Sequence, residues 1–140
     1  MPTSSSRPPR SRSSRRRPSA DLDTVDRRSE TGGLTLAAID LPFDKNLEGY
    51  VSGSEISIIQ EYTDAAGSGP RLHRHPYSET FIVRRGEALF TAGDEQLVVA
   101  GGQVLVVPAQ VPHKFEVLDR GFFESIHIHA NDRFVTEWLE

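Results

Sequence analysis

The stretch GSGPRLHRHPYSETFIVRRG, residues 67–86, places two histidines, His73 and His75, one residue apart and a carboxylate, Glu79, four residues later. Residues i and i+2 of an extended strand point to the same face, so the two imidazoles project together. The intervening segment Pro76-Tyr77-Ser78 can bend the chain and return the carboxylate to the imidazoles. The stretch therefore predicts a cluster of two histidines and one glutamate on a β-strand scaffold.

From residue 34 onward the chain consists of short extended segments separated by turn residues. Segments rich in Val, Ile and Phe recur at intervals of about ten residues, which is typical of an all-β sandwich or barrel. Helical periodicity is not sustained over a comparable length. The last segment, NDRFVTEWLE, fits either a helical turn or a strand; we favour a strand with Phe134, Thr136 and Trp138 on one side. The other expected strands lie within residues 34–39, 55–62, 79–86, 87–93, 95–102, 103–108, 113–118 and 122–130.

The charge is distributed unevenly along the chain. The first 20 residues contain six arginines and no acidic residue, whereas residues 31–140 contain 8 basic and 16 acidic residues. Because the arm offers almost no apolar surface to bury, we expect residues 1–30 to be a disordered tail and residues 31–140 to form the folded domain. An arginine arm can bind nucleic acid, but a solvated tail explains the same composition, so we expect no nucleic-acid partner.

Several classes of protein are disfavoured. No apolar run approaches the roughly 18 residues of a membrane span, and no apolar region follows the arginines as in a secretory signal. The chain has no cysteine, which excludes disulfides, thiolate metal sites and cysteine nucleophiles. We therefore expect a cytoplasmic protein whose metal, if any, is bound by nitrogen and oxygen.

A further histidine, His113, lies in the segment VPAQVPHKF, where Pro108 and Pro112 stiffen the turn before it. Three neutral imidazoles and one carboxylate suit Fe, Mn, Ni, Cu or Zn, and the ligand types alone do not distinguish among these ions. The sequence thus predicts one divalent transition metal. Its expected ligands are His73, His75, Glu79 and His113.

With these residues in place, the chain resembles the cupin superfamily of small β-barrels. The first cupin motif, G-x5-H-x-H-x3-4-E-x6-G, is matched with every spacing kept, from Gly67 to Gly86. The second motif, G-x5-P-x-G-x2-H-x3-N, is matched at Gly102, Pro108 and His113. Its glycine is replaced by Gln110 and its asparagine by Val117, departures that concern the loop shape rather than the metal ligands.

The resemblance covers about residues 34–130 and implies a double-stranded β-helix, or jelly-roll, with the metal inside one mouth. Cupins include dioxygenases, isomerases, decarboxylases and non-enzymatic binders, and a fold alone does not choose among them. Our first hypothesis is a dioxygenase or oxidase acting on a small molecule of the enol, phenol or diketone type. A redox-neutral cyclase or isomerase, and a non-catalytic binder of a metal or small ligand, remain alternatives.

Two more histidines, His127 and His129, share one face of the segment SIHIHA, opposite Ile126 and Ile128. They either line the pocket or form a polar face. We predict catalytic roles for Glu79 and His127.

One of the adjacent residues Gln60 and Glu61 must face inward. The aromatic residues that either wall the cavity or fill the core are Tyr77, Phe81, Phe115 and Phe123.

The edges of a small open β-sandwich are exposed, and pairing across a two-fold axis is a common way to cover them. The segments LTLAAI (34–39) and FVTEWL (134–139) are the apolar candidates for such pairing. We therefore expect a homodimer that binds a small-molecule substrate.

Overall fold

The computed structural model describes residues 27–28, 35–36, 38–118 and 121–140, in two compact units, 1–39 and 40–140. In the first unit, β1 (Arg27–Arg28) pairs antiparallel with β2 (Thr35–Leu36). Apart from β1, the predicted tail lies outside the described residues. Of the expected strand at 34–39, the described part in a strand is Thr35–Leu36.

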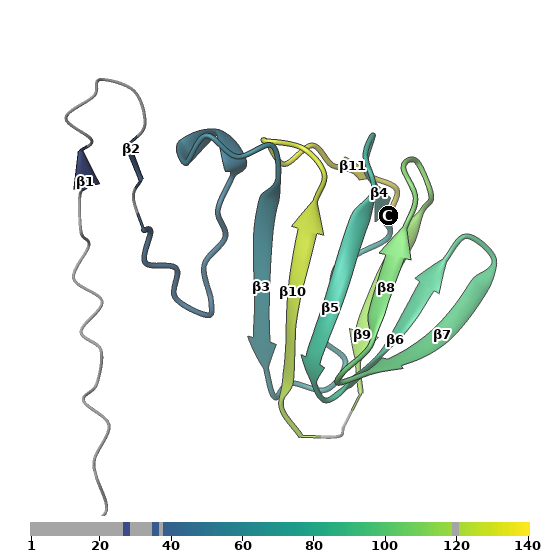
Figure 1. Cartoon of the computed structure of the whole chain (residues 1–140). Coiled ribbons are helices and arrows are strands. Elements are labelled where there is room, and N and C mark those ends of the chain that lie inside the picture. Colours follow the sequence, from purple (N-terminus) through teal and green to yellow (C-terminus); the bar gives the residue numbers. More distant parts are fainter. Residues whose placement is uncertain (1–26, 29–34, 37, 119–120) are drawn as a thin grey trace, which may run out of the picture. The chain divides into compact units, whose positions relative to one another are not determined.

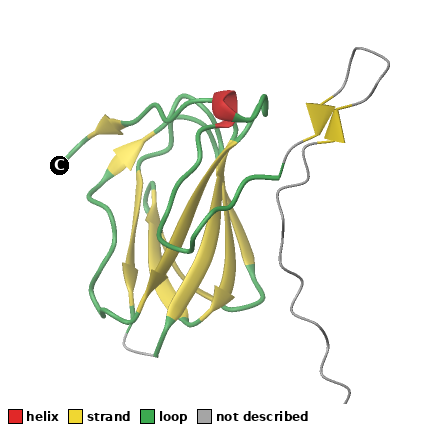
Figure 2. Cartoon of the chain, turned by 90° about the vertical axis from the view of Figure 1, so that its left-hand side faces the viewer, coloured by secondary structure: helices red, strands yellow, loops and turns green. Residues whose placement is uncertain are grey.

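The second unit has the predicted jelly-roll arrangement, two antiparallel sheets with the core between them (Figures 1 and 2). The first sheet contains β3 (Ser57–Thr63), β10 (Phe123–His129), β5 (Glu79–Arg85) and β8 (Val104–Val107), in that order. The second contains β11 (Glu137–Trp138), β4 (His73–Arg74), β9 (His113–Val117), β6 (Glu87–Ala92) and β7 (Glu95–Ala100). A short 3-10 helix, η1 (Gly49–Val51), precedes β3, and no helix of the described residues is long and apolar enough to cross a membrane.

Alternating burial along the strands forms the core. On β5 and β10 the odd-numbered side chains from Glu79 to Val83 and from Phe123 to His129 are buried, while the even-numbered ones are partly exposed. This is the period-two pattern of a strand with one face against a core. One end of the interior is filled mainly by the aromatic side chains of Phe81, Phe90, Phe115 and Phe123. The other end contains the buried histidines.

Two turn positions, Gly86 and Gln110, have a positive φ. Gly86, between β5 and β6, has φ 77°, and a Cβ there would lie 2.4 Å from the Phe122 carbonyl oxygen, so the position requires glycine. Gln110, where the second cupin motif has glycine, keeps the left-handed conformation with φ 67°. Its N–H donates to the His75 carbonyl at 2.8 Å. The substitution has therefore not changed the handedness of the loop, and Val117, in place of asparagine, is buried in the core.

The C-terminal segment returns to the mouth of the second unit. β11 pairs with β4, with Glu137 opposite Arg74 and Trp138 opposite His73. As predicted from strand parity, Phe134, Thr136 and Trp138 all face the same pocket. The strand itself is only two residues long, and the rest of the segment lies along the mouth without ladder pairing in the described structure.

Candidate metal centre

All five histidines of the chain lie buried at one mouth of the barrel, around a pocket of about 370 Å³ or directly beside it. His73 begins β4 and His75 follows it, Glu79 begins β5 and His113 begins β9. The remaining two, on β10, face the same interior. Strand pairing brings these segments together, because His113 is directly opposite His73 and His129 is directly opposite Glu79.

The four predicted ligands converge. One potential ligand atom from each of His73, His75, Glu79 and His113 lies within 4.8 Å of the others. Oε2 of Glu79 is 2.8 Å from Nε2 of His113 and 3.0 Å from Nε2 of His75. Four donor atoms this close, all buried, make a nitrogen and oxygen set suited to one divalent transition metal.

The backbone fixes which nitrogen of each ring faces the pocket. Nδ1–H of His73 donates to the Arg71 carbonyl at 2.7 Å, Nδ1–H of His75 to the Val135 carbonyl at 2.8 Å, and Nδ1–H of His113 to the Val111 carbonyl at 2.9 Å. In a neutral imidazole the other nitrogen then carries a lone pair. Nε2 of His73 and of His75 is thus prepared to accept a metal ion, an arrangement typical of metal-ligating histidines. Nε2 of His113 is hydrogen-bonded to Oε2 of Glu79 at 2.8 Å and would exchange that proton for a metal ion.

The donor set also contains a buried atom that the protein does not satisfy. Among the described residues Nε2 of His75 has no hydrogen-bond partner, although Oε2 of Glu79 lies 3.0 Å away. A buried polar atom without a partner is unfavourable unless water or an ion completes it. The residues therefore fit a bound metal.

Electrostatics keep the site in the metal-binding protonation state. Burial lowers the pKa of His73, which favours the neutral imidazole. Burial alone would raise the pKa of Glu79, but the imidazoles of His113, His129 and His75 outweigh it and hold that pKa well below its usual range. The glutamate is therefore ionised and the histidine neutral near pH 7.

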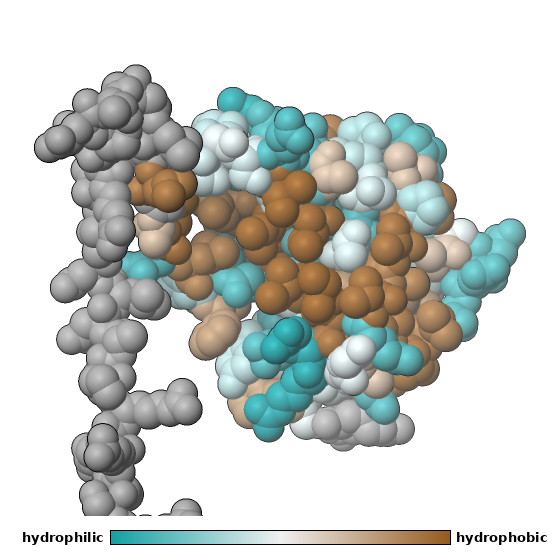
Figure 3. All heavy atoms as spheres, viewed as in Figure 1, coloured by the Kyte–Doolittle hydropathy of each residue, from teal (hydrophilic) through white to brown (hydrophobic). Residues whose placement is uncertain are grey.

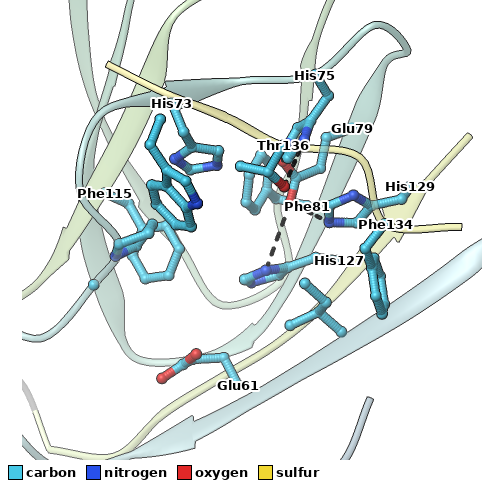
Figure 4. Close-up of a pocket in the computed structure, with 14 residues that line it drawn as sticks. Glu61, His73, His75, Glu79, Phe81, Phe115, His127, His129, Phe134 and Thr136 are labelled. Atoms are coloured by element: carbon cyan, nitrogen blue, oxygen red, sulfur yellow. Dashed lines mark hydrogen bonds and ion pairs between the residues drawn. The ribbon is translucent and has the colours of Figure 1, made fainter. Parts of the chain in front are cut away.

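The other oxygen of Glu79 faces a second pair of histidines. Oε1 lies 3.0 Å from Nε2 of His129 and 3.8 Å from Nδ1 of His127 (Figure 4). Nδ1 of His129 is hydrogen-bonded to the Tyr77 hydroxyl at 2.9 Å, and that hydroxyl accepts the Val135 N–H at 3.0 Å. The Tyr77 proton is therefore free to be donated to His129. This chain of contacts fixes the ring beside Glu79.

His127 lies deeper in the pocket, between the ring of Phe81 and the Ser125 hydroxyl. The centroids of the His127 and Phe81 rings are 4.6 Å apart, and Oγ of Ser125 is 2.6 Å from Nε2. Burial lowers the pKa of His127 to about 4, so the ring is neutral near pH 7. A neutral imidazole beside the pocket can exchange a proton through Nδ1.

The comparisons with known proteins agree with this geometry. A family model described as the cupin domain matches residues 60–121, and the structural neighbours share the fold. Residues 60–121 thus match the cupin family model, and the second unit has the cupin fold. The chain's relative acireductone dioxygenase 1 of Pectobacterium atrosepticum is 32% identical over 105 residues, covering 70% of this cupin and 61% of that enzyme. This cupin thus spans less than two thirds of that relative's length.

Solved structures extend the likeness of fold. A cupin-like protein of Thermotoga maritima is 21% identical with a TM-score of 0.59, covering 68% of this cupin and 73% of that chain. An oxalate oxidase in complex with the substrate analogue glycolate is 16% identical with a TM-score of 0.59, covering 71% of this cupin and 57% of that chain. A DMSP lyase of Ruegeria pomeroyi is 23% identical with a TM-score of 0.53, covering 61% of this cupin and 43% of that chain. At these identities the comparison establishes the fold of this cupin alone.

The structure also shows which of the residues that the sequence left open face the pocket of this cupin. Of the two adjacent candidates, Glu61 faces the pocket, while the Gln60 amide donates outside it to the Leu41 and Pro42 carbonyls. Phe81 and Phe115 line the pocket, whereas Phe123 is fully buried in the core.

Sequence reasoning did not find the contribution of Ser125, or the role of the Tyr77 hydroxyl. Ser125 shares the inward face of β10 with His127. That shared parity was the available signal for Ser125. No local pattern linked Tyr77 to a histidine 52 positions away.

Proposed function

We propose that this cupin is a metal-dependent dioxygenase acting on a small molecule with an enol, phenol or diketone pair of oxygens. The observation that carries the proposal is the convergence of His73, His75, Glu79 and His113 on one point inside a buried pocket. A redox-active divalent metal there would supply Lewis acidity toward chelating oxygens and the ability to activate O₂.

The pocket supports a small organic substrate. Its volume of about 370 Å³ and its lining by Ile59, Phe81, Phe115 and Trp138 suit a compact, largely apolar molecule. The four protein ligands come from both sheets, at one mouth of the barrel. They would leave coordination positions of a six-coordinate ion free for substrate oxygens.

The pocket residues have distinct tasks in this proposal. His127 is hydrogen-bonded through Nε2 to the Ser125 hydroxyl; in the tautomer in which Nε2–H donates, Nδ1 carries the lone pair and accepts the hydroxyl proton of the substrate. Glu79 stays ionised and fixed between the histidines, which favours a ligand role over that of a mobile base. The aromatic walls exclude water from the reacting oxygens.

The sequence relative supports oxygen chemistry over the redox-neutral alternatives, since its name is that of a dioxygenase. A cyclase, an isomerase and a non-catalytic binder would use the same ligand set. The metal and the consumption of O₂ distinguish these functions, and they define the test.

The test begins with elemental analysis of the purified protein, followed by O₂-electrode measurements after reconstitution with Fe²⁺, Ni²⁺, Mn²⁺ or Zn²⁺. Catechol, a flavonol and acetylacetone serve as the substrate panel. We expect at least one redox-active metal to support O₂ consumption with a member of this panel. Retention of Zn²⁺ with no O₂ consumption under any metal would overturn the dioxygenase and favour the cyclase, isomerase or binder.

Two matched variants on β9 control the experiment. His113→Gln removes an imidazole whose Nε2 faces Glu79, so both metal content and O₂ consumption should be lost. Glu116→Gln changes an exposed side chain on the same strand and should leave both unchanged.

A further inference from the structure

Glu61 is a second carboxylate of the pocket, placed far from Glu79. On the first sheet Glu79 is opposite His129, and Glu61 is opposite Ser125, four residues further along β10. That separation corresponds to about 13 Å along the strands at about 3.3 Å per residue. Figure 4 shows Glu61 beyond His127, at the other side of the pocket from the Glu79 cluster.

The Glu61 carboxylate has no protein partner in the described structure. No hydrogen bond or ion pair joins it to a described residue, and the residues that line the pocket include no lysine or arginine. The only cause of its raised pKa is burial. Glu61 is partly buried, and a substrate in the pocket would remove more water from its carboxylate, so this position favours a ligand that brings a hydrogen-bond donor.

We propose that Glu61 determines substrate specificity by accepting a hydrogen bond from the end of the substrate that lies away from its chelating oxygens. This inference rests on the proposed function, because it assumes that the other end binds the metal. The substrate class is then an elongated molecule with a chelating oxygen pair, an apolar middle and a terminal donor. An ammonium group is the best donor for a carboxylate, and a terminal carboxylate is the worst group, since two like charges would be buried together.

The experiment measures binding of three catechols to the Zn²⁺-loaded protein, because Zn²⁺ does not oxidise them. Dopamine carries a terminal ammonium, dihydrocaffeate a terminal carboxylate, and ethylcatechol neither. We expect dopamine to bind about tenfold or more tightly than dihydrocaffeate, as a charge-assisted hydrogen bond implies. Glu61→Gln should bring the three dissociation constants within about threefold of one another, and Glu61→Lys should reverse the order.

Glu124→Gln is the matched control. Glu124 lies on β10 opposite Tyr62, on the outer face of the same sheet, so its substitution should leave the preference for dopamine unchanged. Equal binding of all three catechols by the unaltered protein would overturn the proposed role of Glu61 but leave the proposed chelating function intact. Failure of all three to bind, with one Zn²⁺ per chain retained, would overturn the proposed chelating function and this proposal with it.

A different observation concerns the outer face of the first sheet. Its partly or largely exposed side chains form two aliphatic rows across four strands. Across β3, β10, β5 and β8, the first row is Ile58, Ile128, Thr80 and Val106. The second row, in the same strand order, is Gln60, Ile126, Ile82 and Val104. Figure 3 shows these hydrophobic side chains gathered over β3, β10, β5 and β8, and no charged residue lies within either row. We call this surface the aliphatic face.

The geometry points to a second copy of the chain as the partner that covers the aliphatic face. β3, β10 and β5 have seven residues each and β8 has four, so at standard β spacing the face is about 19 Å wide across the strands and up to about 23 Å long. The two rows contain no charged side chain, so they can pack on the same rows of a second copy across a two-fold axis without burying an unpaired charge; Glu124 and Arg85 lie on this sheet outside the rows. The predicted homodimer would then form through a sheet face, not through the edge segments 34–39 and 134–139.

Sedimentation equilibrium tests this contact. We expect the full chain to have the mass of a dimer, twice 15.5 kDa. Val104→Lys with Val106→Lys should give a monomer of unchanged thermal midpoint, since these side chains are already 61% and 55% exposed in the single chain. Leu97→Lys with Val98→Lys, at 56% and 47% exposure on β7 of the other sheet, should remain dimeric.

Three outcomes would overturn the dimer through the aliphatic face. The first is a monomeric full chain, and the second is a Val104/Val106 variant that stays dimeric. The third is a chain that dimerises only after residues 1–39 are deleted, which would mean that the chain's own N-terminal segment covers the face.

Discussion

Nε2 of His129 lies 3.0 Å from Oε1 of Glu79, whereas His75 and His113 both contact Oε2 of the same carboxylate. The two buried groups are in direct contact, so the His129 ring limits rotation of the carboxylate. The ring is itself fixed by the Tyr77 hydroxyl. The orientation of one candidate metal ligand thus depends on a tyrosine that has no place in the ligand set.

Tyr77→Phe should therefore weaken metal binding without removing a ligand. Loss of the hydroxyl frees the His129 ring and leaves the Val135 N–H without its acceptor. Second-layer changes of this kind reduce metal affinity by about 10- to 100-fold. Competition with a chelating dye measures the effect. Tyr50→Phe, at an exposed tyrosine, is the control, and an unchanged affinity in Tyr77→Phe would contradict the proposed role.

Removal of the metal should destabilise the fold. The ligands come from β4, the segment after it, β5 and β9, so one ion would link both sheets. An ion present at about 1,000 times its dissociation constant stabilises the folded state by about 4 kcal/mol. For a domain of this size the thermal midpoint should fall by at least about 10 °C in chelator.

His113→Gln provides the comparison for that measurement, because it loses a ligand. Its thermal midpoint should be the same with and without chelator. A chelator effect in this variant as large as in the unaltered protein would show that the stabilising ion binds elsewhere.

The stability of the metal-free protein should fall as pH is lowered from about 6.5 to about 4. The pKa of His127 is about 4 in the folded state, against 6.5 as the ordinary value, so within this range only the unfolded chain binds the proton. The contribution of His127 is complete above pH 6.5 and is lost as pH falls to 4. It amounts to about 3 kcal/mol, on the scale of 1.36 kcal/mol per pKa unit.

Urea unfolding in chelator across this pH range measures the slope. His127→Gln removes the titrating group, so its stability should depend less steeply on pH than that of the unaltered protein. Identical slopes in the two proteins would show that His127 is protonated in the fold or that it is not buried.

Gln110→Gly should stabilise the protein by about 0.5–1 kcal/mol. Gln110 is the one described residue other than glycine with a positive φ, at 67°, a conformation that is unfavourable for residues with a Cβ. Ala109→Gly, at the exposed neighbouring position, should instead lose stability, because it adds only backbone freedom. Chemical denaturation of both variants tests the difference, and destabilisation by Gln110→Gly would mean that the glutamine side chain contributes to the loop.

Much of the fold could be predicted from the sequence because strand periodicity is local. Apolar segments at intervals of about ten residues indicated the β-sandwich, and all the expected strands from residue 55 onward are present in the second unit. The spacing of His73 and His75 placed both on one face without any knowledge of the fold. The exception was the segment 34–39, of which two residues are in a described strand, paired outside the second unit's sheets.

The parts of the site that sequence alone did not specify depend on contacts between distant segments. Parity placed His127 and His129 on one face but did not show which of them approaches Glu79 more closely. The pairing of β10 with β5 decided that, by setting His129 directly opposite Glu79. Similarly, Gln60 and Glu61 were equivalent by pattern until the hydrogen bonds of Gln60 to Leu41 and Pro42 drew it outward.

The sequence by itself thus determined the β class, the candidate ligand types and the face on which each candidate projects, because these follow from residue chemistry and a period of two. Tertiary structure decided that the ligands converge, that Tyr77 supports His129, that Glu61 faces the pocket and that the aliphatic face is partly exposed. These features depend on strand register and sheet order. Both are set by packing over the whole domain, which no short stretch of sequence contains.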